Sequence, residues 1–283
     1  MHLQIPIFRE KLLDWYDSQA RALPWRVPAN TSPDPYKIWL SEVMLQQTTV
    51  QAVIPYYLKF LAKWPTIQDL AAASQDDVNR EWAGLGYYSR ARNLLACAKE
   101  IVAQGGIFPR NGEGLQALPG IGPYTAAAIA SIAYNIPANA ADGNVERVMA
   151  RYFAIETPYP EGKKLARDHA ESFIGDYEGR HGDYTQALME LGATICRPKT
   201  PLCGECPVRE GCTAYQAGTQ NDYPKRSPKK ALPHKSAYVF LILDGKGNIY
   251  TEKRPEKGMV GGMIGFPCTE WDEIGIKKQE IPH

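Results

Sequence analysis

Four of the chain's six cysteines lie within one short segment, CRPKTPLCGECPVREGC (196–212). Their spacing is C-x6-C-x2-C-x5-C, with thiols at Cys196, Cys203, Cys206 and Cys212. Four thiolates on short loops can bind one soft metal centre, and both zinc and an iron–sulfur cluster accept four cysteines. A structural zinc site usually has two C-x2-C pairs, and this segment has one, so the uneven spacing favours a loop around a larger cluster. The competing interpretation is two disulfides or free thiols.

Two carboxylates lie in segments that suit opposite protonation states. Glu42 is followed by three apolar residues in SEVMLQQT (41–48), so burial would keep it protonated. Asp142 precedes a Gly-Asn turn in ADGNVERVMAR (141–151), where backbone amides would keep it ionised. Hydrolysis of a glycosidic bond needs an acid that protonates the leaving group and a carboxylate that stabilises the oxocarbenium ion. Each residue also fits a simpler role, Glu42 beside a helix dipole and Asp142 in a turn.

The segment LPGIGPYTAAAIA (118–130) predicts a tight turn that leads into a helix. Gly120 and Gly122 would let backbone amides approach a phosphate closely, and Pro123 suits the first turn of a helix. The helix would then present unpaired N–H groups and the positive end of its dipole. The segment lacks the Lys-Ser/Thr ending of a P-loop. A plain turn between helices is the alternative.

Together these motifs resemble those of the helix–hairpin–helix DNA glycosylases. The cysteine spacing is similar to the 4Fe–4S loop of the endonuclease III and MutY branch, and the 118–130 segment is similar to the family's hairpin. LPWR (23–26), GLGYYSRARNL (84–94) and QALMELGATIC (186–196) resemble the adenine-specific MutY branch. The resemblance covers essentially the whole chain. It implies a structural 4Fe–4S cluster on the four cysteines, which helps to shape a DNA-contacting loop.

The resemblance also implies roles for the residues of a catalytic site. Glu42 would protonate adenine at N7, and Asp142 would stabilise or covalently capture the sugar cation. Asn144 would assist at the same site, and Tyr124 would pack against the reacting nucleotide. Bifunctional enzymes of the endonuclease III type carry a lysine where this chain has Tyr124, so the resemblance implies removal of the base without strand cleavage.

A second set of residues is implied to contact DNA. Gln47 and Tyr87 match residues that wedge into the base stack, which helps to offset the free energy of flipping a base out of the duplex. Without the resemblance they would be a helix-surface and a core residue. The complete implied set of DNA-binding residues is Arg26, Gln47, Tyr87, Gly120, Gly122 and Thr125.

The expected fold is mainly α and two-lobed, with a partial α/β, Nudix-like segment at its C-terminal end. The expected catalytic core spans 1–215. It consists of a helical module with the hairpin at 30–133 and a cluster module formed by 1–29 and 134–215. A basic linker is expected at 216–235 and an incomplete Nudix-like 8-oxoguanine-recognition domain at 236–283. DNA would lie between the two lobes, with Glu42 and Asp142 facing each other across the groove.

Three segments define helices and their breaks. The segment 36–64 predicts two amphipathic helices that meet near Pro55. The segment 74–106 begins with a serine cap and predicts a break at Gly84 or Gly86 before a second helix. The alanine-rich segment 124–134 predicts a buried helix.

The C-terminal residues differ in character from the rest of the chain. SAYVFLILDGKGNIYTEKR (236–254) predicts two strands around a glycine-rich turn. KRPEKGMVGGMIGFP (253–267) resembles the start of the Nudix-related domain with which MutY contacts 8-oxoguanine. No Nudix hydrolase box follows, so we expect no pyrophosphatase activity. The sequence stops before the family's Phe-Ser-His-type loop, so we expect either a fragment or a shortened enzyme with weaker discrimination of 8-oxoguanine.

Composition sets the remaining expectations. The 283 residues are 44% hydrophobic and carry a formal net charge of +1, so a packed core is expected and any nucleic-acid site must be local. No long apolar run and no secretory signal is visible, which favours a cytoplasmic protein without a membrane partner. The resemblance implies a bacterial monomer that is associated with the nucleoid through its function.

The function that the resemblance implies is monofunctional removal of adenine mispaired with 8-oxoguanine or guanine in duplex DNA. An endonuclease III-like glycosylase and lyase for oxidised pyrimidines is one alternative. A non-catalytic protein that binds duplex DNA is another. An electron-transfer protein of the ferredoxin type is the third, and it leaves the hairpin and the two carboxylates unexplained.

Overall fold

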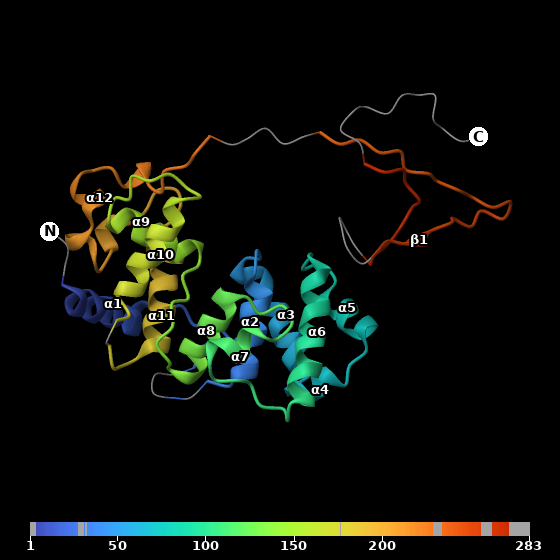
Figure 1. Ribbon diagram of the computed structural model, residues 1–283, viewed down its shortest axis with the longest axis horizontal. Helices are drawn as coiled ribbons and strands as arrows, with labels where there is room; N and C mark the ends of the chain where they lie inside the picture. The colour runs from blue at the N-terminus through green and yellow to red at the C-terminus, as the bar shows by residue number, and fades with distance from the viewer. Residues whose placement is uncertain are drawn as a thin grey trace. The chain divides into compact units, whose positions relative to one another are not determined.

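The protein is mainly α-helical, as the sequence predicts (Figure 1). The computed structural model describes residues 4–27, 31, 33–175, 177–228, 234–255 and 262–271. Internal contacts divide the chain into two units, Met1–Ser227 and Pro228–His283. In the described ranges, no helix combines the length and the apolar character that crossing a bilayer demands.

One lobe of the first unit contains the helices from α2 to α8. Their bounds are α2 (Pro35–Leu45), α3 (Val50–Lys63), α4 (Ile67–Ala71), α5 (Gln75–Trp82), α6 (Tyr88–Ala103), α7 (Gly112–Gln116) and α8 (Pro123–Tyr134). Their apolar faces meet in one core, in which Trp39, Trp82 and Tyr57 are fully buried. The predicted alanine-rich helix is α8, and its burial confirms the prediction.

The other lobe contains α1 and the helices that follow α8. Their bounds are α1 (Ile5–Gln19), α9 (Gly143–Tyr152), α10 (Gly162–Ser172), α11 (His181–Glu190) and α12 (Thr213–Gln216), with a π-helical turn η1 (Leu191–Ile195) and short 3₁₀ turns η2 (Cys203–Glu205), η3 (Arg209–Gly211) and η4 (Gln220–Asp222). Phe8 of α1 packs edge-on against Tyr152 and Phe173, at ring-centroid distances of 5.1 and 4.7 Å. This second core is separate from the first, so the prediction of two lobes is confirmed.

Side chains in the sequence determine where several helices begin. The Asp34 carboxylate accepts from the Tyr36 amide at the start of α2, and the Ser74 hydroxyl accepts from the Asp77 amide at the start of α5. Gly84 and Gly86 have φ values of +102° and +71°, a left-handed backbone that most other residues avoid. The predicted serine cap and the predicted break between α5 and α6 are both confirmed.

The prediction that two helices meet near Pro55 is wrong. Pro55 lies inside α3, and the break falls at residues 46–49. Gln47 has a left-handed φ of 57°, which ends the α2 path, and Thr49 caps α3 by accepting from the Ala52 amide. The buried side chains of α3 on both sides of Pro55 hold this helix together despite the proline.

The two lobes meet along a close contact between α8 and α11. The Ser131 hydroxyl on α8 donates to the His181 carbonyl oxygen at 3.0 Å and lies 2.7 Å from the Thr185 hydroxyl. Gly182 lets the backbones approach, because a Cβ there would lie only 2.9 Å from the Ser131 carbonyl oxygen. The contact between α8 and α11, called the seam below, therefore combines buried hydroxyl hydrogen bonds with a close backbone approach at Gly182.

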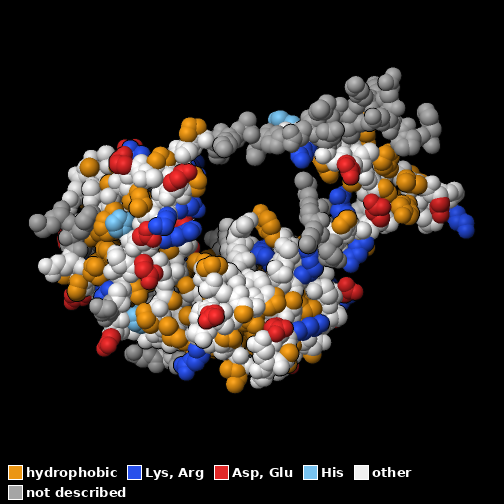
Figure 2. Space-filling model, in the orientation of Figure 1, with side chains coloured by type: hydrophobic (Ala, Val, Ile, Leu, Met, Phe, Trp, Pro, Cys, Tyr) orange, Lys and Arg blue, Asp and Glu red, His pale blue; other side chains and the backbone are white. Residues whose placement is uncertain are grey.

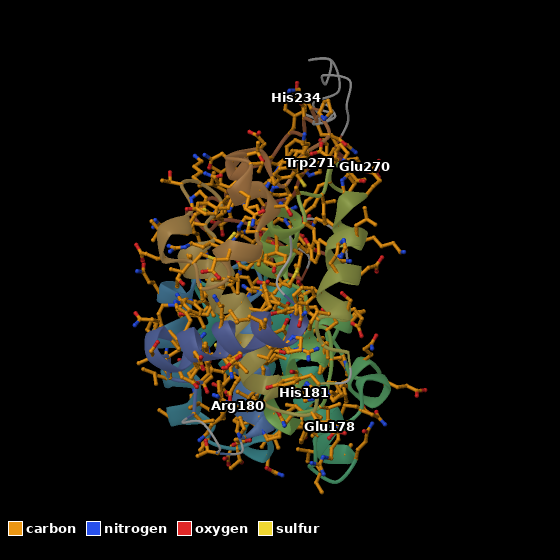
Figure 3. All side chains as sticks on the ribbon, turned by 90° about the vertical axis from the view of Figure 1, so that its left-hand side faces the viewer. Glu178, Arg180, His181, His234, Glu270 and Trp271 are labelled. Atoms are coloured by element: carbon orange, nitrogen blue, oxygen red, sulfur yellow. The ribbon has the colours of Figure 1, made fainter. Side chains whose placement is uncertain are left out.

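Helix α1 is tied to α11 by charge as well as by packing. Arg180, at the beginning of α11, donates to both carboxylate oxygens of Asp17 on α1 at 2.6 and 2.8 Å, and to Asp183 at 2.7 Å. Figure 3 shows Arg180 and His181 together at this end of α11. The N-terminal helix is thus fixed to the lobe that follows α8, although more than 100 residues separate them in the sequence.

One face of the first unit carries charges of both signs. On the face in Figure 2, Lys and Arg side chains are mixed with Asp and Glu side chains rather than forming one continuous basic field. Two cations of α10, Lys163 and Arg167, are themselves paired with the buried Glu146 at 3.0 and 2.6 Å. This mixture agrees with the small net charge of the chain.

The second unit has little regular structure in its described residues. Its strands are β1 (Glu252–Lys253) and β2 (Ile264–Gly265), which pair antiparallel. Asp244 forms the predicted glycine-rich turn by accepting from the amides of Lys246 and Asn248, and an isolated bridge joins Leu243 to Ile249. Parts of the expected linker and Nudix-like segment, at 229–233, 256–261 and 272–283, lie outside the described residues. The Nudix relationship stays a prediction.

We expect Gly182→Ala to lower the free energy of unfolding by about 1–3 kcal/mol, because the new methyl group would press on the backbone of α8. Chemical denaturation followed by circular dichroism measures this. Gly112→Ala is the matched control, since its Cβ would have no neighbour closer than 3.9 Å. Equal stability of the two variants would show that the α8–α11 seam is not tightly packed.

Candidate active site

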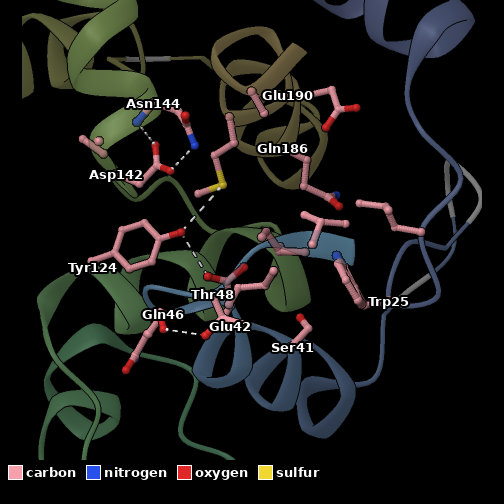
Figure 4. Close-up of a pocket in the computed structure, with 18 of the residues that line it drawn as sticks. Trp25, Ser41, Glu42, Gln46, Thr48, Tyr124, Asp142, Asn144, Gln186 and Glu190 are labelled. Carbon is pink, nitrogen blue, oxygen red and sulfur yellow. Dashed lines mark hydrogen bonds between the residues drawn. The ribbon is translucent and has the colours of Figure 1, made fainter. Parts of the chain in front are cut away.

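The predicted catalytic residues line one cavity of about 640 Å³ in the first unit. Glu42 comes from α2 and Tyr124 from the first turn of α8, whereas Asp142 and Asn144 lie at the start of α9. Figure 4 shows Glu42 and Tyr124 pointing toward each other, with Asp142 and Asn144 beyond them. The structure therefore brings together four residues that are up to about 100 positions apart in the sequence.

Glu42 is a buried carboxyl group of this cavity whose pKa is raised. Only 7% of its surface is exposed, and its Oε2 accepts a hydrogen bond from the Tyr124 hydroxyl at 3.0 Å. Burial raises the Glu42 pKa to about 7; the Tyr124 hydrogen bond opposes this rise, and the charge of Asp142 adds to it. Glu42 can therefore hold a proton near neutral pH, as the apolar neighbours in its sequence predict.

Tyr124 is placed by the hairpin that precedes α8. Pro123 begins the helix, so the next side chain projects from its first turn. The hydroxyl donates to Glu42 and lies 3.8 Å from the Met189 sulfur on α11. Burial, with the neighbouring carboxylates, raises the Tyr124 pKa well above its usual range, so the phenol keeps its proton and stays a donor.

Asp142 is the N-cap of α9. Its Oδ1 accepts from the Asn144 and Val145 amides at 2.9 and 2.8 Å, and its Oδ2 accepts from the Asn144 side-chain amide at 2.7 Å. The amide donors that the sequence predicts are present. They do not act alone, because burial is the larger influence and raises the Asp142 pKa, while the hydrogen bonds oppose it. Asp142 accepts three hydrogen bonds here and Glu42 one, which favours ionisation of Asp142 over Glu42.

Arg147, which the sequence analysis missed, fixes the orientation of Asn144. Its guanidinium donates to the Asn144 Oδ1 at 2.8 Å, to the Gly192 carbonyl oxygen at 2.7 Å and to the Cys196 carbonyl oxygen at 2.8 Å. Because Asn144 Oδ1 is occupied by Arg147, its amide group faces Asp142. The three-residue spacing of Asn144 and Arg147 on one helix is the sequence signal that could have indicated the pair.

The far end of the cavity carries a buried charge network. Glu190 of α11 is 1% exposed and accepts from Arg21 at 2.6 and 2.7 Å and from Arg26 at 2.8 Å. Burial alone would raise the Glu190 pKa, but the two arginines outweigh it and hold this pKa at about 2. Arg26 also donates to the Arg21 carbonyl oxygen at 2.9 Å, so its guanidinium is committed to this wall. Its DNA contact stays a prediction.

Two predicted DNA-contacting residues lie in strained turns. Gln47 and Tyr87 have left-handed φ values of 57° and 49°, and the Tyr87 side chain is 61% exposed. This conformation is uncommon and energetically unfavourable for non-glycine residues, so it persists where the surrounding structure holds it. Both residues therefore stand on loops whose shape is fixed rather than within regular helix.

The predicted hairpin residues differ in what they can offer a ligand. Gly120 has a φ of +75°, and a Cβ there would meet the Asn93 side chain at 2.7 Å, whereas a Cβ on Gly122 would enter open space. Thr125 is 2% exposed, and its hydroxyl accepts from the Gln46 side chain at 3.3 Å. Its hydroxyl faces the protein interior, so a DNA contact at Thr125 would have to use the backbone amide.

The four clustered cysteines line one apolar cavity of the second lobe, together with Ile195, Val208 and Tyr215. None of the chain's six cysteines forms a disulfide. Within the described ranges, no group of three or more His, Cys, Asp or Glu side chains is arranged to hold a single metal ion. Tetrahedral zinc would need sulfurs about 3.8 Å apart. Four thiols around one shared cavity are a donor set that an iron–sulfur cluster accepts.

The helical fold and its cavity with the carboxyl groups of Glu42 and Asp142 agree with the match of this sequence to a known protein family. Residues 40–174 match the model of the HhH-GPD superfamily of base excision DNA repair proteins. Within that superfamily the chain belongs to the adenine DNA glycosylase family. It is 38% identical over 263 residues to the adenine DNA glycosylase of Buchnera aphidicola subsp. Baizongia pistaciae, and covers 73% of that protein and 92% of itself.

Longer relatives agree with this assignment, and solved structures share the fold. The human adenine DNA glycosylase is 38% identical over 323 residues, which cover 95% of this chain and 58% of the human protein. The chain thus spans about half the length of several curated relatives that it matches. A thermostable thymine-DNA glycosylase structure has a TM-score of 0.65 at 29% identity and covers 75% of this chain. An endonuclease III–DNA complex, at 22% identity and a TM-score of 0.60, shares the fold.

We expect Glu42→Gln to stabilise the protein at pH 8 by up to about 3 kcal/mol. Raising the Glu42 pKa from 4.5 to about 7 means that the native state binds more protons than the unfolded chain between these pH values. Stability of the wild type therefore falls as pH rises through this window, and the uncharged glutamine avoids that loss.

Thermal unfolding midpoints of the wild type and the variant, measured between pH 5 and pH 8, check this sign. The advantage of Glu42→Gln should shrink toward pH 5. Glu178→Gln, at an exposed position, is the control and should show no such trend. A Glu42→Gln variant that is equally stable at pH 8 and pH 5, relative to wild type, would mean that Glu42 ionises without penalty.

Proposed function

We propose that the protein is a monofunctional DNA glycosylase that removes adenine mispaired with 8-oxoguanine or guanine from duplex DNA. The observation that carries this proposal is the buried carboxyl group of Glu42, which has a pKa of about 7. It lines the same cavity as the hydrogen-bonded carboxyl group of Asp142. Membership of the adenine DNA glycosylase family supports the choice of base. The cavity, at about 640 Å³, is within the range of pockets that enclose a nucleotide-sized ligand.

Glu42 acts as the general acid. Adenine is a poor leaving group unless it receives a proton, and a carboxyl group that is half-protonated near neutral pH can supply one. The Tyr124 hydroxyl holds the Glu42 carboxyl through its Oε2, which leaves the other oxygen free to address the base. As the base departs with the electrons of the glycosidic bond, positive charge grows on the sugar.

Asp142 stabilises that charge. The three N–H donors that converge on it favour its ionised form, and they fix both carboxylate oxygens. A fixed carboxylate in a site with little water stabilises an oxocarbenium ion without reorganising during the reaction. Water then completes the hydrolysis at the sugar, either directly or after a covalent Asp142 adduct.

The absence of an amine at position 124 separates this proposal from its runner-up. A glycosylase with lyase activity needs a nucleophilic amine that forms a Schiff base with the sugar. Tyr124 cannot do this, and its phenol instead remains protonated against Glu42. A non-catalytic DNA-binding protein is the second alternative, and it gives no reason for burying a carboxyl group at this pKa.

DNA is gripped through backbone groups rather than through a basic field. Gly120, Gly122 and the start of α8 offer amides and a positive helix end to one phosphate. Such contacts hold the duplex in register without reading its sequence, which suits a search for rare mispairs. Gln47 and Tyr87 enter the base stack and help to extrude the adenine.

Cys196, Cys203, Cys206 and Cys212 would hold a 4Fe–4S cluster. When bound, the cluster supplies a rigid covalent cross-link between η1, the following loop and α12. Arg151 supports this region from α9, because its guanidinium donates to the Arg197 carbonyl oxygen at 2.7 Å and to the Tyr223 carbonyl oxygen at 3.1 Å. The cysteine loop is thereby fixed to α9, the helix that Asp142 caps.

The central test is a single-turnover assay on a labelled duplex with adenine opposite 8-oxoguanine or guanine. We expect strand breaks only after alkali, because an abasic site is left intact. Glu42→Gln should reduce release by at least about 100-fold, since proton transfer to the leaving group contributes this much. Borohydride should trap no protein–DNA adduct of the Schiff-base type. Breaks before alkali, together with trapping, would favour the lyase alternative, and binding without release would favour the non-catalytic one.

A separate prediction concerns the cluster. Protein purified without oxygen should be brown and contain about four iron atoms per chain. Cys206→Ser should lose the visible absorbance and the iron, and should unfold at a lower temperature. Cys268→Ser is the matched control, because Cys268 belongs to the second unit and is not one of the four clustered cysteines. A colourless protein that binds one zinc ion would contradict the proposal.

A further inference from the structure

Arg90, in the first turn of α6, places a buried cation at the end of α2. Arg90 is only 8% exposed to solvent. Its Nη1 donates to the carbonyl oxygens of Val43 and Met44 at 3.1 and 2.9 Å. These carbonyl groups belong to the last turn of α2, directly after Glu42, where the helix dipole is negative.

The other terminal nitrogen of Arg90 reaches two loops. Its Nη2 donates to the Thr48 hydroxyl and to the Leu85 carbonyl oxygen, both at 3.1 Å, and lies 3.5 Å from the Gly86 carbonyl oxygen. Thr48 belongs to the loop that follows α2, and residues 85 and 86 belong to the turn before α6. One guanidinium group therefore joins the 46–49 loop to the 84–87 turn.

Both of these loops contain a left-handed residue that the proposed function assigns to DNA. Gln47 precedes Thr48, and Tyr87 follows Gly86. The guanidinium also lies over the Tyr87 ring, 5.6 Å from its centroid, and over the Trp82 ring at 5.2 Å. The strained conformations of Gln47 and Tyr87 need surroundings that hold them, and Arg90 contacts the backbone on either side.

The choice of arginine is itself informative. All five acceptors of Arg90 are uncharged, and no ion pair to it is found among the described residues. Burial of a cation without a carboxylate partner is unfavourable, so the carbonyl contacts must compensate for it. A lysine would keep the charge but has one nitrogen, so it cannot contact α2 and both loops in this fork geometry.

We propose that Arg90 is a positioning residue that holds the Gln47 and Tyr87 loops at a fixed spacing, so that both side chains enter the DNA stack together when a base is extruded. This inference rests on the proposed function. Arg90 acts on the opening of the base pair and not on proton transfer. Its contacts reach the 46–49 loop, the 84–87 turn and the backbone of α2, but not the Glu42 carboxyl group.

The test compares two duplexes in single-turnover release of adenine. In one duplex the adenine lies opposite guanine, and in the other it lies opposite an abasic-site analogue, where it is already unpaired and is extruded more easily. Arg90→Lys should slow release from the first duplex at least about tenfold, since base extrusion requires a few kcal/mol. Release from the second duplex should slow no more than about threefold. Equal losses on both duplexes, or no loss, would overturn the inference.

Arg9→Lys is the matched control. Arg9 donates to the carbonyl oxygens of Phe173 and Ile174 at 2.6 and 2.7 Å and lies over the Tyr177 ring, so it has the same kinds of contact in the other lobe. It should leave the ratio of the two rates unchanged. If Arg9→Lys shifts the ratio as Arg90→Lys does, the effect is general loss of stability and the inference fails.

A second variant covers the case in which Arg90→Lys melts below the assay temperature. Thr48→Val keeps the shape of the side chain and removes the hydroxyl that Arg90 contacts. A selective loss on the guanine duplex supports the inference, and equal relative rates on the two duplexes overturn it. Wild-type protein that releases adenine from neither duplex would instead contradict the proposed function, so the two failures are distinguishable.

Discussion

The structure depends on keeping one carboxyl group out of water. Glu42 can hold a proton near neutral pH because it is buried in a cavity that residues of α2, α8 and α11 line together. No single helix could provide this, so the cavity is assembled from both lobes, and the Ser131–Thr185 seam holds them together beside it. The penalty of burying Glu42 is met by the two hydrophobic cores, which lie around the cavity rather than in it. The two lobes are therefore arranged around a carboxyl group whose burial is energetically unfavourable.

Much of this arrangement could be predicted from short sequence segments. Helix caps such as Ser74 and breaks at Gly84 and Gly86 depend on neighbours within a few positions, so local rules suffice. The apolar neighbours of Glu42 indicate its burial, but the partners that set its pKa, Tyr124 and Asp142, lie far away in the sequence. Pro55 shows where such rules fail, because packing on both sides of a proline can keep a helix intact. The family resemblance supplied the site residues that local chemistry left ambiguous.

The parts that could not be predicted are contacts between distant arginines and backbone carbonyl groups. Arg90, Arg147 and Arg151 each bridge segments about 40 or more residues apart. The motifs in which they stand do not indicate which distant carbonyl groups they contact. The Glu190 network with Arg21 and Arg26 is similar, since it joins positions more than 160 residues apart. Arginine is suited to this work because its fork satisfies several carbonyl groups at once. Sequence periodicity carries no information about such partners.

The left-handed backbone at Gln47 and Tyr87 places stability and activity in opposition. Glycine at either position would relax the backbone, by roughly 1 kcal/mol, and at Tyr87 it would also remove an exposed aromatic ring. A laboratory selection for thermal resistance alone would therefore favour replacing the two side chains that we propose to enter DNA. Backbone strain that is retained at such positions indicates selection for function rather than for stability. Directed evolution of a more robust enzyme from this chain should hold both positions fixed and seek its gains elsewhere.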